Sequence, residues 1–327
     1  MAPRRPAATK PRAQSAAVLR ARPAAPLATT NGAPVGDRLG VRKTYKLYIG
    51  GEFPRTESGR SYEVFSARGE LLANACRGTR KDIRDAVRAA RNALAGWSSR
   101  TAFNRGQVLY RIAELLEGRR EQFIAEVMAA EGIGRQRATR LVDAAIDRWV
   151  WYAGWADKYS QMSGSVNQVA GSYFNFSVPE PSGVVGVIAP EGSSLLGLVS
   201  RLAPVIVSGN CAVVLASESR PLPGVTLTEV LATSDVPGGV VNLITGLRRE
   251  LVTHLAGHMD VNALDAYGLD PAQGVAVEEL ATENVKRLVR PPRGGADGVD
   301  WLSPRAQSPY LIGEFTETKT VWHPIGA

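Results

Sequence analysis

Between residues 183 and 268, short apolar runs alternate with segments of helical periodicity. The runs are rich in β-branched residues, as is typical of strands that are buried on both faces. They are GVVGVIAP (183–190), CAVVLA (211–216), GVVNLITG (239–246) and VNALDAYG (261–268). Between them, apolar residues recur at helical spacing over 195–207, 225–232 and 247–258. The alternation predicts an α/β fold with a Rossmann-like parallel sheet and flanking helices, whose ligands bind at the carboxyl ends of the strands.

The preceding part of the chain predicts a small antiparallel meander followed by helices. Residues 44–78 alternate apolar and polar positions and contain glycine turns, which is typical of short paired strands. Helical spacing follows over 79–99, 104–130 and 135–159. Alternation returns near 160–180 and predicts a hairpin. The last helix carries a stripe of aromatic residues, which we interpret as core or subunit interface: Trp149, Trp151, Tyr152, Trp155 and Tyr159.

The net charge of +8 is confined to the first 43 residues. This segment holds nine Lys and Arg but one acidic residue, so the rest of the chain is neutral. Its Ala, Pro and Arg composition predicts a disordered basic tail, either a flexible interaction arm or an organelle transit peptide. The neutral remainder argues against nucleic-acid binding by the folded part. Apolar runs are too short for a membrane span, and we expect a cytoplasmic protein.

Two local patterns suggest other chemistry but lack the residues to complete it. His254 and His258 have the i, i+4 spacing of helical metal ligands, yet no third ligand is evident, so we interpret them as surface residues. GSSLLG (192–197) loosely resembles a nucleophile elbow, but the G-x-S-x-G spacing is absent. Cys76 and Cys211 lack metal-binding spacing, and Cys211 falls in a predicted core strand.

An ordered series of motifs resembles the aldehyde dehydrogenase superfamily. The motifs are LYIGGEF (47–53), YAGWADK (152–158), EPSGVVGVIAP (180–190), LAPVIVSGN (202–210), VPGGVVNLITG (236–246), HMDVNALDAYG (258–268), NVKRLVRP (284–291) and FTETKTVWHPIG (315–326). The resemblance implies a nucleotide-binding domain, a catalytic domain with a cysteine nucleophile, and a β-arm that pairs subunits. We therefore expect a tail over 1–43, a nucleotide-binding domain over 44–292, and a remnant linker with an oligomerisation strand over 293–327.

The resemblance implies NAD(P) as cofactor, but several matching positions have changed. The candidate cofactor-binding residues are Ile188, Ala189, Pro190, Glu218, Gly246 and Gly268. Leu215 stands where the family has a lysine near the ribose, and residues 247–250 replace a glycine-rich stretch. Leu269 replaces a serine at the pyrophosphate-binding helix terminus, and Asp270 adds a carboxylate that would repel phosphate.

The residues that the resemblance would assign to catalysis are missing or replaced. Gly192 occupies the position of the family's oxyanion-hole asparagine, and the general-base glutamate falls near Pro291. No cysteine follows Cys211, so the nucleophile has no counterpart. We assign no catalytic residue and expect a pseudoenzyme.

The retained arm suggests pairing with another protein. Residues 173–178 and 315–322 match the arm, which in the family packs against a neighbouring subunit's catalytic domain. We expect a hetero-oligomer with a full-length aldehyde dehydrogenase, with a homo-oligomer as the alternative. An NAD(P)-dependent oxidoreductase acting on an aldehyde or oxo group, and a binding module that uses the basic tail, remain competing hypotheses.

Overall fold

A five-stranded parallel sheet forms the centre of the fold. The computed structural model describes residues 41–291 and 298–326. The sheet has the order β10-β9-β6-β7-β8, and every neighbouring pair in it is parallel. Its strands are β6 (Val184–Ile188), β7 (Cys211–Leu215), β8 (Val241–Ile244), β9 (Ala263–Asp265) and β10 (Arg287–Val289). All residues of β6 to β9 are buried, which explains their continuous apolar character and confirms the α/β prediction.

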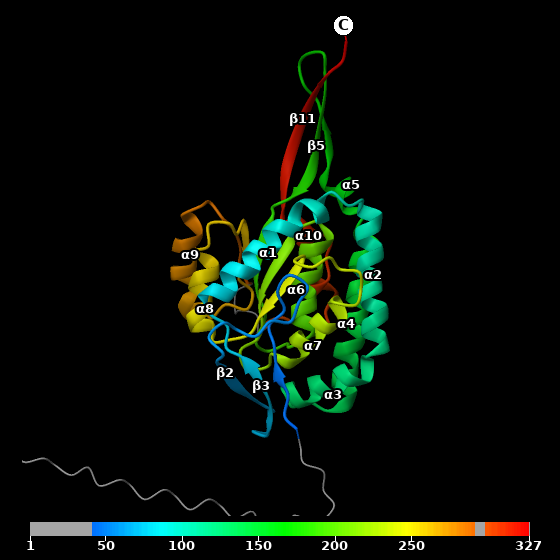
Figure 1. The fold of residues 1–327 in the computed structure, drawn as a ribbon. Coiled ribbons are helices and arrows are strands. Elements are labelled where there is room, and N and C mark those ends of the chain that lie inside the picture. The colour runs from blue at the N-terminus through cyan, green and yellow to red at the C-terminus, as the bar shows by residue number, and fades with distance from the viewer. Residues whose placement is uncertain (1–40, 292–297, 327) are drawn as a thin grey trace, which may run out of the picture. The chain divides into compact units, whose positions relative to one another are not determined.

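Helices cover both faces of this sheet (Figure 1). Helices α1 (Arg80–Ser98) and α8 (Arg248–Ala256) contact each other and the central strands. Helix α6 (Leu196–Val207) contacts β6 and β7, and α7 (Leu222–Leu231) contacts β8. Every residue of α6 is buried because a second helical layer covers it. Helix α9 (Gly274–Thr282) packs against α8 and β10.

The helical layer over α6 is built from the segments that precede the sheet. The predicted helix over 104–130 is two helices, α2 (Ala102–Gly118) and α3 (Arg120–Glu131), and the backbone at Arg119 leaves helical geometry between them. They pack on α4 (Arg135–Trp155), which the short α5 (Tyr159–Ser163) follows. In the aromatic stripe, Trp149, Tyr152 and Tyr159 are buried, which confirms the interpretation as core for these three residues. Trp151 and Trp155 are half-buried and pack against the core.

The predicted N-terminal meander is correct for two of its strands and wrong for the first. Strands β2 (Ser61–Phe65) and β3 (Leu71–Cys76) are antiparallel, but β1 (Thr44–Tyr45) runs parallel to β3. The chain leaves this sheet after β1 because Tyr48 exchanges backbone hydrogen bonds of 3.0 and 2.7 Å with Leu243 of β8. The connection ties the small sheet to the edge of the large one.

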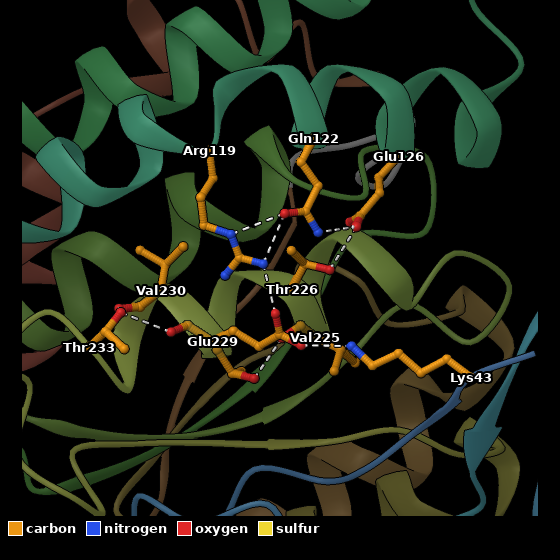
Figure 2. A network of polar contacts seen from close by, with 10 residues as sticks. Lys43, Arg119, Gln122, Glu126, Val225, Thr226, Glu229, Val230 and Thr233 are labelled. Carbon is orange, nitrogen blue, oxygen red and sulfur yellow. Dashed lines mark hydrogen bonds and ion pairs between the residues drawn. The ribbon is translucent and has the colours of Figure 1, made fainter.

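A polar network attaches the start of the described chain to the helices (Figure 2). Glu229 of α7 forms ion pairs with Lys43 Nζ at 2.8 Å and with Arg119 Nη2 at 2.7 Å. On the neighbouring turn, Thr226 donates a hydrogen bond of 3.0 Å to Glu126 of α3. These contacts hold residue 43 in the folded body, although sequence analysis assigned it to the tail. The other predicted tail residues up to 40 lie outside the described residues.

The arm is a separate three-stranded antiparallel sheet in the order β11-β5-β4. Strand β5 (Tyr173–Pro181) pairs along nine residues with β11 (Thr316–Pro324), and β4 (Ser165–Asn167) completes the hairpin. Figure 1 shows β5 and β11 side by side, although 134 residues lie between them in the sequence. Both the predicted hairpin and the predicted terminal strand are therefore confirmed.

Buried arginines fix the segment that leads into β11. This segment contains the turn η3 (Pro304–Ala306) and the helix α10 (Tyr310–Gly313). Arg148 of α4 donates hydrogen bonds of 3.0 Å to the carbonyls of Trp301 and Ala306. Arg201 of α6 lies 2.6 Å from Asp265 and 2.9 Å from Glu314, the residue that follows α10. Across 41–291 and 298–326, no helix combines the length and apolar character that a bilayer crossing requires.

Candidate functional site

The carboxyl ends of β6, β7, β8 and β9 are where this fold class places its ligands. The ends of these strands and the loops after them carry the six residues that sequence analysis assigned to a cofactor. The structure brings three of the loops together around one side chain that sequence analysis did not assign, that of Arg248 in the first turn of α8. The site is therefore best described from this arginine outward.

Arg248 lies at the strand ends, and only 9% of the residue is exposed. Its guanidinium donates hydrogen bonds to Gly268 O at 2.6 Å, to Ala189 O, and to Ala216 O at 3.5 Å. These carbonyls follow β9, β6 and β7, so one side chain connects three strand ends. Burial lowers the pKa of Arg248, and the nearby carboxylates of Glu191 and Glu218 oppose that shift.

Glu191 supplies the counter-charge in the loop after β6. Its Oε1 lies 2.8 Å from Arg248 Nε, and this contact is ionic because Nε has no aligned hydrogen-bond acceptor. The carboxylate also accepts hydrogen bonds from the Ser217 hydroxyl at 2.6 Å, the Glu218 amide at 2.7 Å and the Ser219 hydroxyl at 2.8 Å. Burial alone would raise the pKa of Glu191, but Arg248 and these donors outweigh it and lower the pKa.

Glu218, the residue that matches the glutamate of the family's cofactor site, contacts the start of α8. Its Oε2 accepts a hydrogen bond of 2.7 Å from the Arg248 amide. A carboxylate in this position satisfies a free amide of the first helical turn and complements the positive end of the helix dipole. Glu218 therefore serves as a helix cap in this structure, and its assignment to a ribose stays a prediction.

The two site glycines lie where the backbone leaves no room for a side chain. A Cβ on Gly268 would lie 2.1 Å from Ala189 O, and its amide donates a hydrogen bond of 3.0 Å to Ile188 O. Gly246 has φ +152°, and a Cβ there would lie 2.9 Å from a methyl group of Leu251. Pro190, like Ile188 and Ala189, is buried. Packing between protein segments thus accounts for both glycines, and cofactor contact by these residues stays a prediction.

The helix terminus after β9 already carries a carboxylate. Asp270 accepts a hydrogen bond of 2.9 Å from the Ala272 amide and caps the turn η1 (Pro271–Gln273), which leads into α9. The polar side chains of the loop before α6 are also engaged within the protein. The Ser194 hydroxyl donates a hydrogen bond of 2.7 Å to Glu131, and the Ser193 hydroxyl accepts one of 2.9 Å from the Gly197 amide. The nucleophile-elbow pattern therefore consists of serines that are engaged in local structure.

The two cysteines are core residues. Both are buried, and burial raises the pKa of Cys211 in β7 to about 12, which suppresses the thiolate that a nucleophile requires. His254 is exposed on α8, as predicted for a surface residue, whereas His258 is half-buried just after the helix and accepts a hydrogen bond from the Asp260 amide at 3.2 Å. Within the described ranges, no group of three or more His, Cys, Asp or Glu could hold a metal ion.

Comparison with known proteins identifies the class to which this fold and these strand-end loops belong. The model of the aldehyde dehydrogenase family matches residues 54–291. Aldehyde dehydrogenase 1A1 of Gallus gallus is 31% identical over 253 residues, which cover 75% of this chain and 49% of that protein. An Aspergillus niger aldehyde dehydrogenase is 30% identical over 80% of this chain and 51% of its own length. The chain belongs to the aldehyde dehydrogenase family.

Solved structures agree with this assignment. An NAD+ complex of aldehyde dehydrogenase from Bacillus cereus superposes with a TM-score of 0.70 at 26% identity, covering 75% of this chain and 50% of that one. HpcC from Thermus thermophilus gives a TM-score of 0.71 at 29% identity, covering 75% and 47%. The chain thus spans about half the length of the relatives that it matches.

Proposed function

We propose that the chain is a non-catalytic member of the aldehyde dehydrogenase family that pairs through its arm with a complete aldehyde dehydrogenase. The observation that carries the proposal is the arm itself, a nine-residue β5–β11 ladder with apolar side chains exposed to solvent. The arm is intact, whereas the chain matches only about half of its relatives.

The arm has exposed apolar side chains on its edge strands, as is typical of a surface that packs against another protein. Val166 is 71% exposed, Trp322 57%, and Tyr173 and Phe174 nearly half. Val166 lies in the edge strand β4, and Trp322 lies in the edge strand β11. Unpaired edges with exposed aromatic residues are poorly tolerated in isolated proteins, so a partner strand or sheet is expected to cover them.

The strand-end crevice supports the non-catalytic half of the proposal because its residues do not fit a nicotinamide dinucleotide. The Arg248 guanidinium is bound to three backbone carbonyls, and the Glu191 carboxylate has its own donors. Asp270 places negative charge where the family would bind pyrophosphate. Both cysteines are buried, and Cys211 is the first residue of β7, at the end of that strand opposite to these loops.

Co-expression with a complete aldehyde dehydrogenase from the same host tests the pairing. We expect a stoichiometric complex, measured as native mass by light scattering, because that enzyme would supply the surface against which the arm packs. Trp322→Ala should weaken the complex at least tenfold, as is common for a buried interface aromatic residue. Tyr110→Ala, which removes a half-exposed aromatic residue of α2 outside the arm, is the matched control.

A homo-oligomer or a monomer in the presence of the full-length enzyme would overturn the pairing. The competing function, an NAD(P)-dependent oxidoreductase, has one observation in its favour, the similarity to a relative solved with NAD+. It predicts measurable heat when NAD(P) is titrated into the isolated chain and aldehyde-dependent reduction of the nucleotide.

A further inference from the structure

The strand-end crevice is closed by groups that the protein itself supplies. The guanidinium of Arg248 reaches the carbonyls of Ala189, Ala216 and Gly268, which are the points where β6, β7 and β9 end. In related folds, backbone groups at these positions face a nucleotide. Here they face a side chain that enters from the first turn of the next helix.

Groups of the protein contact every nitrogen of the Arg248 guanidinium, two by hydrogen bonds to carbonyls and Nε by an ionic contact. Nη1 and Nη2 contact carbonyls, and Nε lies against Glu191. Glu191 accepts hydrogen bonds in turn from Ser217, Ser219 and the Glu218 amide, while the Glu218 side chain accepts a hydrogen bond from the Arg248 amide. A phosphate that approached this arginine would have to displace a carboxylate and three carbonyls from a desolvated cation.

We propose that Arg248 replaces the dinucleotide in this chain: its guanidinium is an internal ligand that closes the crevice and holds three strand ends together. Two consequences follow. The chain does not bind NAD(P), and its stability depends on a guanidinium group at this position. This inference goes beyond the proposed pairing and does not need a partner, so each can fail without the other.

Nucleotide binding is tested on the isolated full-length chain with NAD+, NADP+ and ADP-ribose. We expect no heat of binding and no shift in Tm with ligand at millimolar concentration, because Arg248 occupies the strand ends. The Tm measurement is sensitive enough for this test, since a ligand present at a hundredfold excess over its Kd would stabilise the folded state measurably. Saturable binding of either dinucleotide with a submillimolar Kd would overturn the proposal.

The structural role is tested by Arg248→Ala, with Arg249→Ala as the matched control. Both variants remove an arginine from the first turn of α8, but Arg249 is exposed. We expect Arg248→Ala to lower the Tm by several degrees and Arg249→Ala to leave it nearly unchanged. Because the first variant opens a guanidinium-sized cavity, ethylguanidinium at low millimolar concentration should raise its Tm and should not raise that of the unmodified chain.

Arg248→Lys keeps the test informative where the alanine variant does not fold. A lysine retains the charge but cannot reach three carbonyls and a carboxylate from a single planar group. We expect its Tm to lie between those of the unmodified chain and the alanine variant. A lysine variant as stable as the unmodified chain, or an alanine variant as stable as Arg249→Ala without any response to ethylguanidinium, would contradict the internal-ligand role.

Discussion

Gly268 shows how close the strand ends approach each other in this protein. A Cβ at this residue would lie 2.1 Å from Ala189 O and 2.5 Å from Ile188 O, both of which are backbone atoms. Backbone on a buried strand cannot rotate away as a flexible side chain can. The glycine is therefore required by the packing of β9 against β6, whether or not any ligand binds beside it.

Gly268→Ala should destabilise the fold by about 1–3 kcal/mol, the usual cost of overpacking, because the neighbouring backbone atoms cannot move away. Urea unfolding followed by circular dichroism measures the change. Gly274→Ala is the control: nothing lies within 4 Å of a Cβ there, and the residue begins α9, so alanine should be neutral or stabilising. Equal effects of the two substitutions would contradict the packing argument.

Glu191 makes the crevice sensitive to acid. Its pKa in the folded chain lies below the ordinary value of 4.5, so the unfolded state takes up the proton first as the pH falls. The stabilisation that Glu191 gives is complete above pH 4.5 and is lost as the pH falls through the folded pKa. Because 35% of the side chain is exposed, we expect about 1–2 kcal/mol at neutral pH, less than for a fully buried pair.

Urea midpoints of the unmodified chain and of Glu191→Gln, measured from about pH 6 to pH 3.5, test this titration. The difference in stability should be largest at the higher pH and should shrink below pH 4.5. Glu63→Gln serves as the control, since Glu63 is exposed and forms no ion pair among the described residues. A difference for Glu191→Gln that is constant across the range would show that its charge is not responsible.

At the scale of elements, β11 depends on the residue that precedes it. Phe315 is fully buried, and the guanidinium of Arg201 lies 5.7 Å from its ring centroid. The adjacent Glu314 forms an ion pair with the same arginine. The start of β11 is therefore anchored in the core next to α6, whereas its later residues are largely exposed.

Phe315→Ala should cost about 3–5 kcal/mol, the usual range for emptying a buried phenylalanine site. Tyr310→Ala, in the neighbouring α10, should change stability by no more than about 0.5 kcal/mol, because this tyrosine is 73% exposed. Both values come from urea unfolding. A small loss for Phe315→Ala would mean that the segment before β11 is not an integral part of the core.

The elements with strong periodicity were predictable, and those decided by long-range contacts were not. The runs that became β6, β7 and β8 are continuous and apolar because both of their faces are covered. The parallel pairing of β1 with β3 was not predicted, because it depends on Tyr48 reaching Leu243 in a distant strand. Such pairing leaves no local pattern in the sequence.

The candidate site was predictable in its location but not in its chemistry. Residues such as Glu218 and Gly268 follow strands whose parallel order places them at one edge of the sheet. The central residue, Arg248, looked only like a substitution in a glycine-rich stretch. Its contacts with carbonyls 20, 32 and 59 residues away depend on the direction of the side chain, which spacing does not encode. The sequence feature that could have indicated this ion pair was the presence of oppositely charged residues, Glu191 and Arg248, shortly after two core strands.

For the whole molecule, the excess positive charge lies in the basic N-terminal segment and not in the folded body. Residues 1–40 contain seven Lys and Arg and one Asp, so removing them lowers the net charge from +8 to +2. Lys43, by contrast, contacts Glu229 and belongs to the body of the protein (Figure 2). The structure therefore gives a boundary at which the basic segment can be removed while the contacts of Lys43 and β1 are kept.

A chain that begins at Val41 should unfold at the same urea concentration as the full chain, because the contacts of Lys43 and β1 are retained. It should also elute from heparin at a distinctly lower salt concentration, since fewer cations displace counterions from the polyanion. A chain that begins at Lys46 is the matched comparison: it loses both the Lys43–Glu229 ion pair and the β1–β3 pairing, and should be less stable. Unchanged heparin elution after removal of residues 1–40 would locate the anion-binding surface in the folded body, and would rule out a binding function that depends on the basic segment.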